Sequence, residues 1–174
     1  GDLETNPFSG VADKTQIKKE TETANPFSPE ELKAYFAKIE RDGTTAVWVS
    51  RLLLYTGARL EEMAQLRTEW IKEIDGIMCI DLRSAKTKNR ESQRIVPIHA
   101  RLIELGFLKF VRSQKSEMLF SDLKEREGRF SFALSRDLNR RVKAACPDAV
   151  NLRVHSFRST FKVKGVNRHA ILTP

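Results

Sequence analysis

The feature that most constrains this chain is an apolar pattern over about residues 44–56 that ends at Thr56-Gly57. The pattern leaves little polar surface on any side, so a helix formed by it must lie deep in a core. Apolar residues over 60–66 then recur at a spacing close to 3.6, which indicates a second buried helical stripe. Gly57 can adopt the backbone angles that a helix end requires. The pattern therefore predicts two packed helices, with Arg59 at the start of the second.

The position of Arg59 leaves two interpretations open. A guanidinium held between buried helices is costly unless it meets an anion. That anion can be the carboxylate of Glu62 or of another acidic side chain, which would make Arg59 a structural residue. It can equally be a bound ligand, and the rest of the chain is needed to decide between the two.

The composition is that of a globular protein, since 40% of the 174 residues are hydrophobic and 31% are charged. A chain of this length suffices for one domain that buries about 70% of its unfolded surface. It has no run of about eighteen apolar residues, and Asp2 and Glu4 do not suit a secretory signal. Cys79 and Cys146 with three histidines make neither a metal framework nor a disulfide scaffold. We therefore expect a reducing, cytoplasmic setting, and the composition indicates neither a metal site nor a cofactor site.

The formal charge is +8, and the basic residues are clustered. Residues 83–94 hold five basic residues and one acidic residue, and residues 151–174 hold five basic residues and no acidic one. Residues 1–24 hold five acidic and three basic residues. Clustered positive charge is the footprint of a protein that binds a polyanion. A solvated basic surface without a partner is the alternative.

Residues 1–24 are polar and show no sustained periodicity, and we expect a tail or linker there. Residues 25–174 are expected to form the folded domain. A helix begins after Ser28, a capping residue that is followed by Pro29 and by Glu31, which completes a capping box. The buried stripe of this helix is Leu32, Tyr35, Phe36 and Ile39.

The middle of the chain alternates between polar and apolar residues in two short stretches, 77–82 and 94–98, which is the pattern of strands. The connection between the two stretches is polar and basic. We expect its tip to carry Lys86, Lys88 and Arg90. The two strands and their connection are interpreted as an antiparallel hairpin.

The second half of the chain is mainly helical. Residues 99–112 and 129–145 carry apolar residues at helical spacing. A shorter segment follows, in which His155 and Arg158 stand three apart and face the same way on a helix. Together with the strands, these patterns predict an α+β domain that is mainly helical, with a small antiparallel sheet carrying a basic hairpin.

Three separated motifs occur in a defined order. A Thr-Gly-x-Arg-x-x-Glu segment covers 56–62, a basic hairpin with Lys-Thr at 86–87 follows, and His-x-x-Arg-x-Thr-Phe covers 155–161. The last motif alone is weak evidence, because it occurs by chance in many basic proteins. Taken together, the set resembles the catalytic domain of the tyrosine recombinases, the family of the phage integrases and their bacterial relatives. The resemblance extends over about residues 26–171 and implies the fold of that domain.

The resemblance implies a role for five residues. Arg59 and Arg158 match the two catalytic arginines, and Glu62 matches the acidic residue that braces the site. Lys86 matches the hairpin lysine that protonates the leaving 5′ oxygen, and His155 matches the histidine that handles protons at the attacking group. Two guanidiniums suit this chemistry, because a phosphodiester in transfer gains negative charge on its non-bridging oxygens. The implied reaction is site-specific DNA cleavage and rejoining through a 3′-phosphotyrosyl link, as in DNA integration by a phage or mobile element, without metal or ATP.

The chain departs from the family pattern after Arg158, because no tyrosine follows it. The two tyrosines of the sequence, Tyr35 and Tyr55, lie in apolar stripes and are interpreted as packing residues. The segment 165–167 resembles a turn of the family but comes about one helical turn early, and His169 precedes the place of the family's next histidine. We therefore expect a C-terminally incomplete catalytic domain that lacks the nucleophile, binds DNA and does not cleave it alone.

Double-stranded DNA is the expected partner, contacted mostly through its phosphates. The expected contacts are Lys88, Arg90 and Arg94 on the hairpin and Arg136, Arg140, Arg141 and Lys143 on the long helix. The family also implies assembly with other recombinase protomers on DNA, as tetramers. The alternatives are a DNA-binding remnant or regulator that has lost the chemistry, a topoisomerase of the tyrosine type, and a ribonucleoprotein, the last resting on charge alone.

Overall fold

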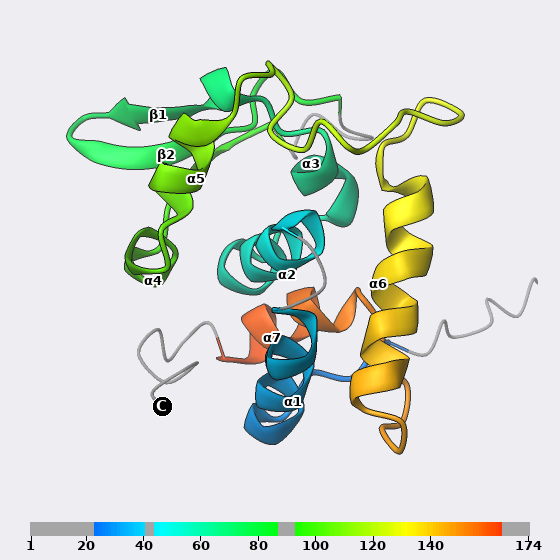
Figure 1. Ribbon diagram of the computed structural model, residues 1–174. Coiled ribbons are helices and arrows are strands. Elements are labelled where there is room, and N and C mark those ends of the chain that lie inside the picture. The colour runs from blue at the N-terminus through cyan, green and yellow to red at the C-terminus, as the bar shows by residue number, and fades with distance from the viewer. Residues whose placement is uncertain (1–22, 41–43, 87–92, 165–174) are drawn as a thin grey trace, which may run out of the picture.

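Helix α2 (Thr44–Thr56) lies at the centre of the molecule, and the other elements surround it (Figure 1). The structure is a computed structural model, and it describes residues 23–40, 44–86 and 93–164. Ten of the thirteen residues of α2 are buried, as the apolar pattern predicts, because α1, α3, α4 and α7 all pack against it. The predicted core helix is confirmed.

Helix α1 (Pro29–Ile39) begins with the predicted capping box. The Ser28 hydroxyl accepts a hydrogen bond from the Glu31 amide (3.1 Å), and the Glu31 carboxylate accepts one from the Ser28 amide (2.8 Å). The predicted stripe of α1 is buried. The local pattern alone was enough here, since a capping box is made by residues three apart.

An aromatic cluster joins α1 to α7 (Ser156–Lys164), which lies far from it in the sequence. The ring centroid of Phe157 on α7 is 4.7 Å from that of Phe27 and 5.2 Å from that of Tyr35. Thr160 Oγ1 accepts a hydrogen bond from the Phe27 amide (2.8 Å). These buried contacts fix the position of α7 against the start of the domain.

Three antiparallel strands form the sheet, in the order β1–β2–β3. Strands β2 (Ile77–Asp81) and β3 (Ile95–Pro97) confirm the predicted pair. Strand β1 (Ile71–Ile74) is absent from the sequence-based expectation, because two charged residues occupy its middle. It pairs with β2 through a turn at Asp75-Gly76, where both residues have positive φ (+50° and +78°), the geometry that Asp-Gly favours in tight hairpins.

Two short helices form over residues 99–112, where the apolar spacing predicts helical structure. Helix α4 (Ala100–Glu104) and helix α5 (Phe107–Ser113) are separated at Gly106, which has a φ of +88°. This left-handed residue ends one helix and redirects the next. The prediction that residues 99–112 are helical is confirmed, but the break was not predicted, because apolar residues at helical spacing occur on both sides of it.

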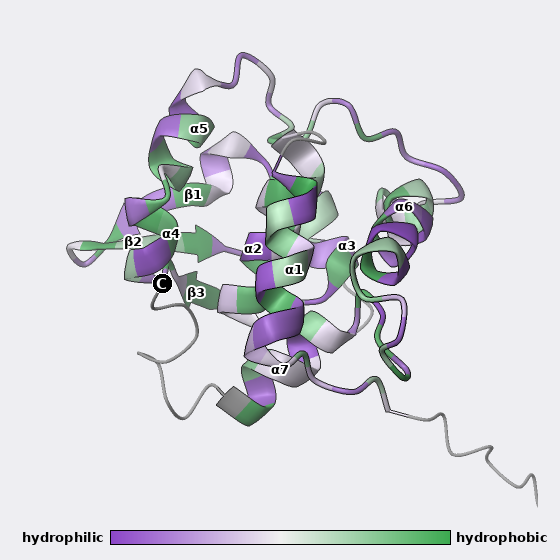
Figure 2. Ribbon diagram, turned by 60° about the horizontal axis from the view of Figure 1, so that its bottom comes forward, coloured by the Kyte–Doolittle hydropathy of each residue, from purple (hydrophilic) through white to green (hydrophobic). Residues whose placement is uncertain are grey.

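Helix α6 (Ser131–Ala145) lies close to the bounds predicted for it, 129–145. The start of α6 is capped by a residue that is far from it in the sequence. The Glu61 carboxylate accepts hydrogen bonds from the amides of Phe130 (3.0 Å) and Ser131 (2.9 Å). Hydrophobic and hydrophilic residues alternate along the helix (Figure 2). Its buried stripe is Leu134, Leu138 and Val142.

Two short elements link α2 to the sheet. They are α3 (Leu60–Ala64) and the 3-10 helix η1 (Thr68–Trp70). The observed fold is therefore α+β, mainly helical with a small antiparallel sheet, as predicted. Within the described ranges, no helix is long and apolar enough to cross a membrane.

The described chain starts close to the expected domain boundary. Ala24 is buried, and the Thr23 carbonyl accepts a hydrogen bond from Asn151 Nδ2 (3.1 Å). The rest of the expected tail lies outside the described residues, as do the segment 165–167 and His169.

Candidate active site

Gly57 shapes the turn between α2 and α3. Its φ is +61°, in the left-handed region. The ring of Phe161 on α7 lies so close that a Cβ added at Gly57 would come within 2.2 Å of Phe161 Cδ1. A side chain is therefore excluded both by the backbone angle and by the contact with α7. This turn determines where Arg59 leaves the core.

Arg59 occupies the N-cap of α3, where it meets Glu62. The Arg59 amide donates a hydrogen bond to Glu62 Oε2 (2.9 Å), and Arg59 Nη1 donates one to Glu62 Oε1 (3.2 Å). The Glu62 side chain is only 3% exposed, whereas that of Arg59 is 51% exposed. The salt bridge to Glu62 that one interpretation predicts is present. The Arg59 side chain is also half exposed, so a second anion can approach it from solvent.

Arg94 holds Glu62 from the other side. Arg94 Nη2 lies 3.0 Å from Glu62 Oε2, and Arg94 Nη1 lies 3.2 Å from Glu62 Oε1, a bidentate arrangement. Burial raises the pKa of Glu62, but the hydrogen bonds from Arg94 and Arg59 outweigh it, so the pKa is lower than its ordinary value of 4.5. Glu62 is therefore an ionised carboxylate that braces two arginines. A contact of Arg94 with DNA stays a prediction.

Arg158, at the start of α7, reaches the turn that carries Arg59. Arg158 Nη1 donates a hydrogen bond to the main-chain carbonyl oxygen of Gly57. Burial lowers the pKa of Arg158, and the positive charge of Arg59 lowers it further. Two guanidiniums from separate helices thus lie close enough to repel each other, and a shared anion would relieve that repulsion.

His155 lies directly before α7, at the surface beside this pair of arginines. Partial burial of the imidazole lowers the pKa of His155, and the positive charges of Arg158 and Lys162 lower it further, below the ordinary value of 6.5. The imidazole is therefore neutral at pH 7 and can accept a proton.

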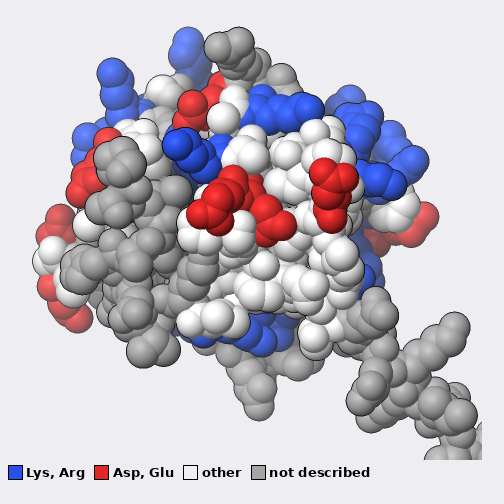
Figure 3. All heavy atoms as spheres, turned by 90° about the horizontal axis from the view of Figure 1, so that it is seen from below, with Lys and Arg blue, Asp and Glu red and all other residues white. Residues whose placement is uncertain are grey.

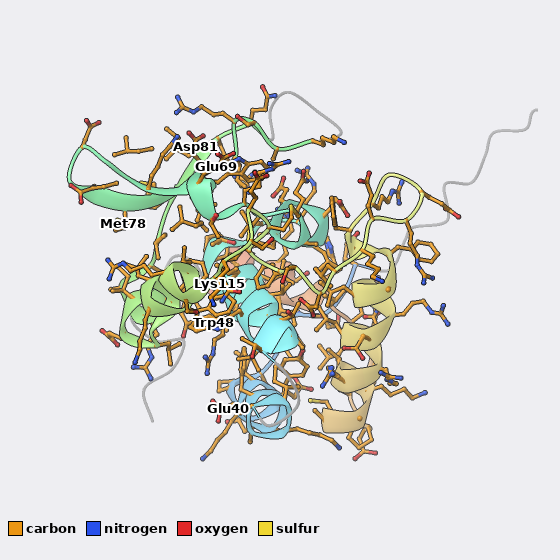
Figure 4. The ribbon with its side chains drawn as sticks, turned by 45° about the horizontal axis from the view of Figure 1, so that its top comes forward. Glu40, Trp48, Glu69, Met78, Asp81 and Lys115 are labelled. Atoms are coloured by element: carbon orange, nitrogen blue, oxygen red, sulfur yellow. The ribbon has the colours of Figure 1, made fainter. Side chains whose placement is uncertain are left out.

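Asp81 fixes the start of the basic connection between β2 and β3 (Figure 4). Its carboxylate lies 2.7 Å from Arg83 Nη2 and 2.8 Å from Lys72 Nζ. Hydrogen bonds from Arg83 and then Lys72 lower the pKa of Asp81 well below its ordinary value. The strand end that leads to Lys86 is therefore held by ion pairs.

Lys86 is exposed, and its main chain is bound by the side chain of Gln65. Sequence reasoning missed Gln65. The available signal is a polar residue that interrupts the apolar stripe directly after α3, and such an interruption does not name its partner. Lys88 and Arg90, the other predicted residues of the connection, lie outside the described residues.

The predicted DNA contacts on α6 form a separate group. Arg140 and Arg141 both pair with Asp137, and Arg136 and Lys143 are exposed. In Figure 3, blue basic side chains gather at the upper right of the face, and other basic groups lie apart from them. Contacts of these four residues with DNA stay predictions.

Both tyrosines are packing residues, as predicted. Tyr35 is fully buried, its hydroxyl lies 2.8 Å from Ser50 Oγ, and burial raises its pKa to about 12. Tyr55 is also buried, and burial raises its pKa. In the described part of the chain, no group of three His, Cys, Asp or Glu side chains is placed to hold a metal ion.

The helices around α2, the three-stranded sheet and the position of the arginines define a class: the chain has the fold of a tyrosine recombinase catalytic domain. Solved structures that share this fold include those of the XerH and XerA recombinases. The XerH site-specific recombinase is similar both in its post-cleavage complex with a palindromic difH substrate (TM-score 0.56, 19% identity) and in its pre-cleavage complex with a difH substrate (TM-score 0.58, 19% identity). The XerA recombinase is similar with a TM-score of 0.60 and 20% identity.

The similarity covers most of this chain and about half of each recombinase. It includes 83%, 87% and 90% of the chain, against 43%, 46% and 54% of the respective XerH and XerA chains. No protein-family model and no curated protein sequence matches the chain. The similarity is therefore one of fold. At 19–20% identity, the comparisons of sequence find no match.

Proposed function

We propose that this chain is the catalytic domain of a site-specific DNA recombinase or integrase, which cuts and rejoins DNA through a 3′-phosphotyrosyl link. The observation that carries the proposal is the convergence of Arg59 and Arg158 at the Gly57 turn, with His155 beside them. Repulsion between two guanidiniums is a cost that a bound phosphate would reverse. The recombinase fold supports the same conclusion independently.

The site contains the groups that phosphoryl transfer from DNA requires. Arg59 and Arg158 would bind the two non-bridging oxygens of one phosphate, and each charge-assisted hydrogen bond is worth about 1.5–3 kcal/mol. His155, neutral at pH 7, would accept the proton of the attacking hydroxyl. The Lys86 ammonium would protonate the 5′ oxygen as it leaves. These steps balance without a metal or a nucleotide cofactor.

The nucleophile is proposed to come from outside this chain. Tyr35 and Tyr55 are buried in the core, so neither can reach a phosphate held at Arg59. The chain also corresponds to about half of each similar recombinase. We infer that the whole protein supplies the tyrosine, that it binds double-stranded DNA in the cytoplasm together with further protomers, and that this chain alone binds DNA without cutting it.

Covalent trapping on a nicked DNA substrate tests the proposal. The full-length protein should form a protein–DNA adduct, and Arg59→Ala or Arg158→Ala should abolish it. Arg101→Ala is a matched control, because Arg101 forms a similar i,i+3 pair with Glu104 on α4 and is not among the main charges that act on Arg158. Near-normal adduct formation by the Arg59 or Arg158 variant would overturn the assignment, and so would an adduct formed by this chain alone.

A second candidate is a DNA-binding domain that keeps the fold without the chemistry, and the burial of both tyrosines favours it. In that case Arg59 and Arg158 would hold phosphates only. The same trapping experiment distinguishes the two, because a full-length protein of this second kind binds the nicked substrate and gives no adduct.

A further inference from the structure

Gln65 uses its side-chain amide to bind both main-chain polar groups of Lys86. Gln65 Nε2 donates a hydrogen bond to the Lys86 carbonyl oxygen (3.0 Å), and the Lys86 amide donates one to Gln65 Oε1 (2.9 Å). Gln65 Nε2 also lies 3.2 Å from the Glu61 carbonyl oxygen, which ties the amide to the last turn of α3. Gln65 is only 5% exposed, and its hydrogen bonds to the exposed Lys86 are partly buried.

The same short helix thereby holds both ends of the basic connection. Glu62 binds Arg94 where the chain returns towards β3, and Gln65 binds Lys86 where the chain leaves β2. Arg59 is the N-cap of this helix. The distance between Arg59 and the main chain of Lys86 is therefore set by α3 and not by the connection itself.

We propose that Gln65 is a positioning residue, which holds the Lys86 main chain so that the Lys86 ammonium reaches the leaving oxygen of a phosphate bound at Arg59. The inference rests on the proposed function. Lysine has a long, flexible side chain, so its ammonium is placed reproducibly only if its Cα is fixed. A displacement of about 1 Å at a reacting group can cost about 100-fold in rate.

A change of leaving group can distinguish an effect on proton transfer from Lys86 from an effect on folding. In strand cleavage the tyrosine oxygen bonds to phosphorus, its proton passes to His155, the bond from phosphorus to the 5′ oxygen breaks, and Lys86 gives a proton to that oxygen. If sulfur replaces the 5′ oxygen, the leaving group is a thiolate, whose conjugate thiol has a pKa of about 8.5, far below the pKa of water or an alcohol. The sulfur substrate therefore needs no proton from Lys86.

The first measurement uses this chain and does not depend on activity. Amide hydrogen exchange at Lys86 should become about tenfold faster in Gln65→Met, which keeps the length of the side chain and removes the amide. Gln114→Met is the matched control, because Gln114 Nε2 also donates to a main-chain carbonyl, that of Phe110 (3.1 Å). Unchanged exchange at Lys86 in Gln65→Met would overturn the proposal.

The second measurement compares the two leaving groups in the full-length protein. Gln65→Met and Lys86→Ala should both slow cleavage of the ordinary substrate, Gln65→Met by 10- to 100-fold, and both variants should cleave the sulfur substrate at close to the wild-type rate. Gln65→Glu keeps the acceptor for the Lys86 amide and loses the donor, so it should fall between Gln65→Met and wild type. Gln114→Met should behave as wild type on both substrates.

The outcomes separate the inference from the proposed function. If Gln65→Met slows both substrates equally, or neither, Gln65 does not act through Lys86 and the inference fails. If Gln65→Met does not fold, the same comparison of the two substrates is made with Gln65→Glu. If wild type forms no adduct at all, the proposed function fails, while the exchange experiment still reports on the hydrogen bonds of Gln65.

Discussion

Arg158 on α7 donates a hydrogen bond to the main-chain carbonyl oxygen of Gly57, the residue directly after α2. This contact brings an arginine from the end of the described chain to within two residues of Arg59. It depends on the absence of a side chain at Gly57, because Phe161, one turn after Arg158, packs against the Cα of that glycine. Correct assembly of the arginine pair is therefore coupled to the packing of α7 on α2.

Gly57→Ala should destabilise the protein by about 2–4 kcal/mol, which adds the cost of a left-handed alanine to that of displacing the Phe161 ring. Gly106→Ala is the matched control. Its φ is also positive, but a Cβ there meets nothing within 4 Å, so it should lose only about 1–2 kcal/mol. The free energy of unfolding in urea measures both. Equal losses in the two variants would show that the contact with Phe161 does not matter.

Glu62→Gln should cost about 1–3 kcal/mol of stability at pH 7, because charge-assisted hydrogen bonds to Arg59 and Arg94 are lost. The folded-state pKa of Glu62 is lower than its ordinary value of 4.5, so its carboxylate stabilises the fold fully above that value. This stabilisation is lost as the pH falls through the folded-state pKa. Urea unfolding between pH 6 and 3 should thus show the gap between wild type and variant closing in acid, and a constant gap would contradict the role of the carboxylate.

Arg158→Gln should raise the pKa of His155, because it removes one of the positive charges that lower it. The pKa should still fall short of 6.5, since loss of solvent is the larger cause and remains. Titration of the imidazole by NMR measures the shift. Arg101→Gln should leave it unchanged, because Arg101 pairs with Glu104 and is not among the main charges that lower the pKa of His155. A lower or unchanged pKa in Arg158→Gln would place the arginine away from the imidazole.

Local signals were sufficient for some elements and not for others. The capping box at Ser28 and Glu31 and the apolar pattern of α2 lie within one helix, so the sequence predicts them directly. The break at Gly106 was missed because it depends on one positive φ. Strand β1 was missed because its polar residues are compatible with a strand only when β2 is beside it.

The candidate site was likewise predicted from the sequence only in part. The resemblance identifies Arg59, Glu62 and Arg158 by motif, and the structure adds how they meet. The resemblance does not identify which residues bind the two ends of the basic connection. The Glu62–Arg94 and Gln65–Lys86 contacts join residues that are 32 and 21 positions apart. Pairings of this range follow from the tertiary fold and leave no periodic signal in one sequence.

The affinity of this chain for double-stranded DNA should fall steeply with salt. If about five phosphates are neutralised, the slope of log affinity against log salt should be about −4 to −5. Arg158→Gln should reduce the magnitude of the slope by about 1, because one phosphate contact is lost. Fluorescence anisotropy over a salt series measures the slope, and a flat response would remove the case for a polyanion partner.

The most direct test of the paired arginines is a titration of this chain with inorganic phosphate, followed by the side-chain Nε–H NMR signals of Arg59 and Arg158. The account predicts that both signals move along one binding curve with a single dissociation constant, while the Arg101 signal stays in place. Movement of only one of the two signals, or two different dissociation constants, would mean that the guanidiniums do not share a phosphate, and the proposed site would have to be abandoned.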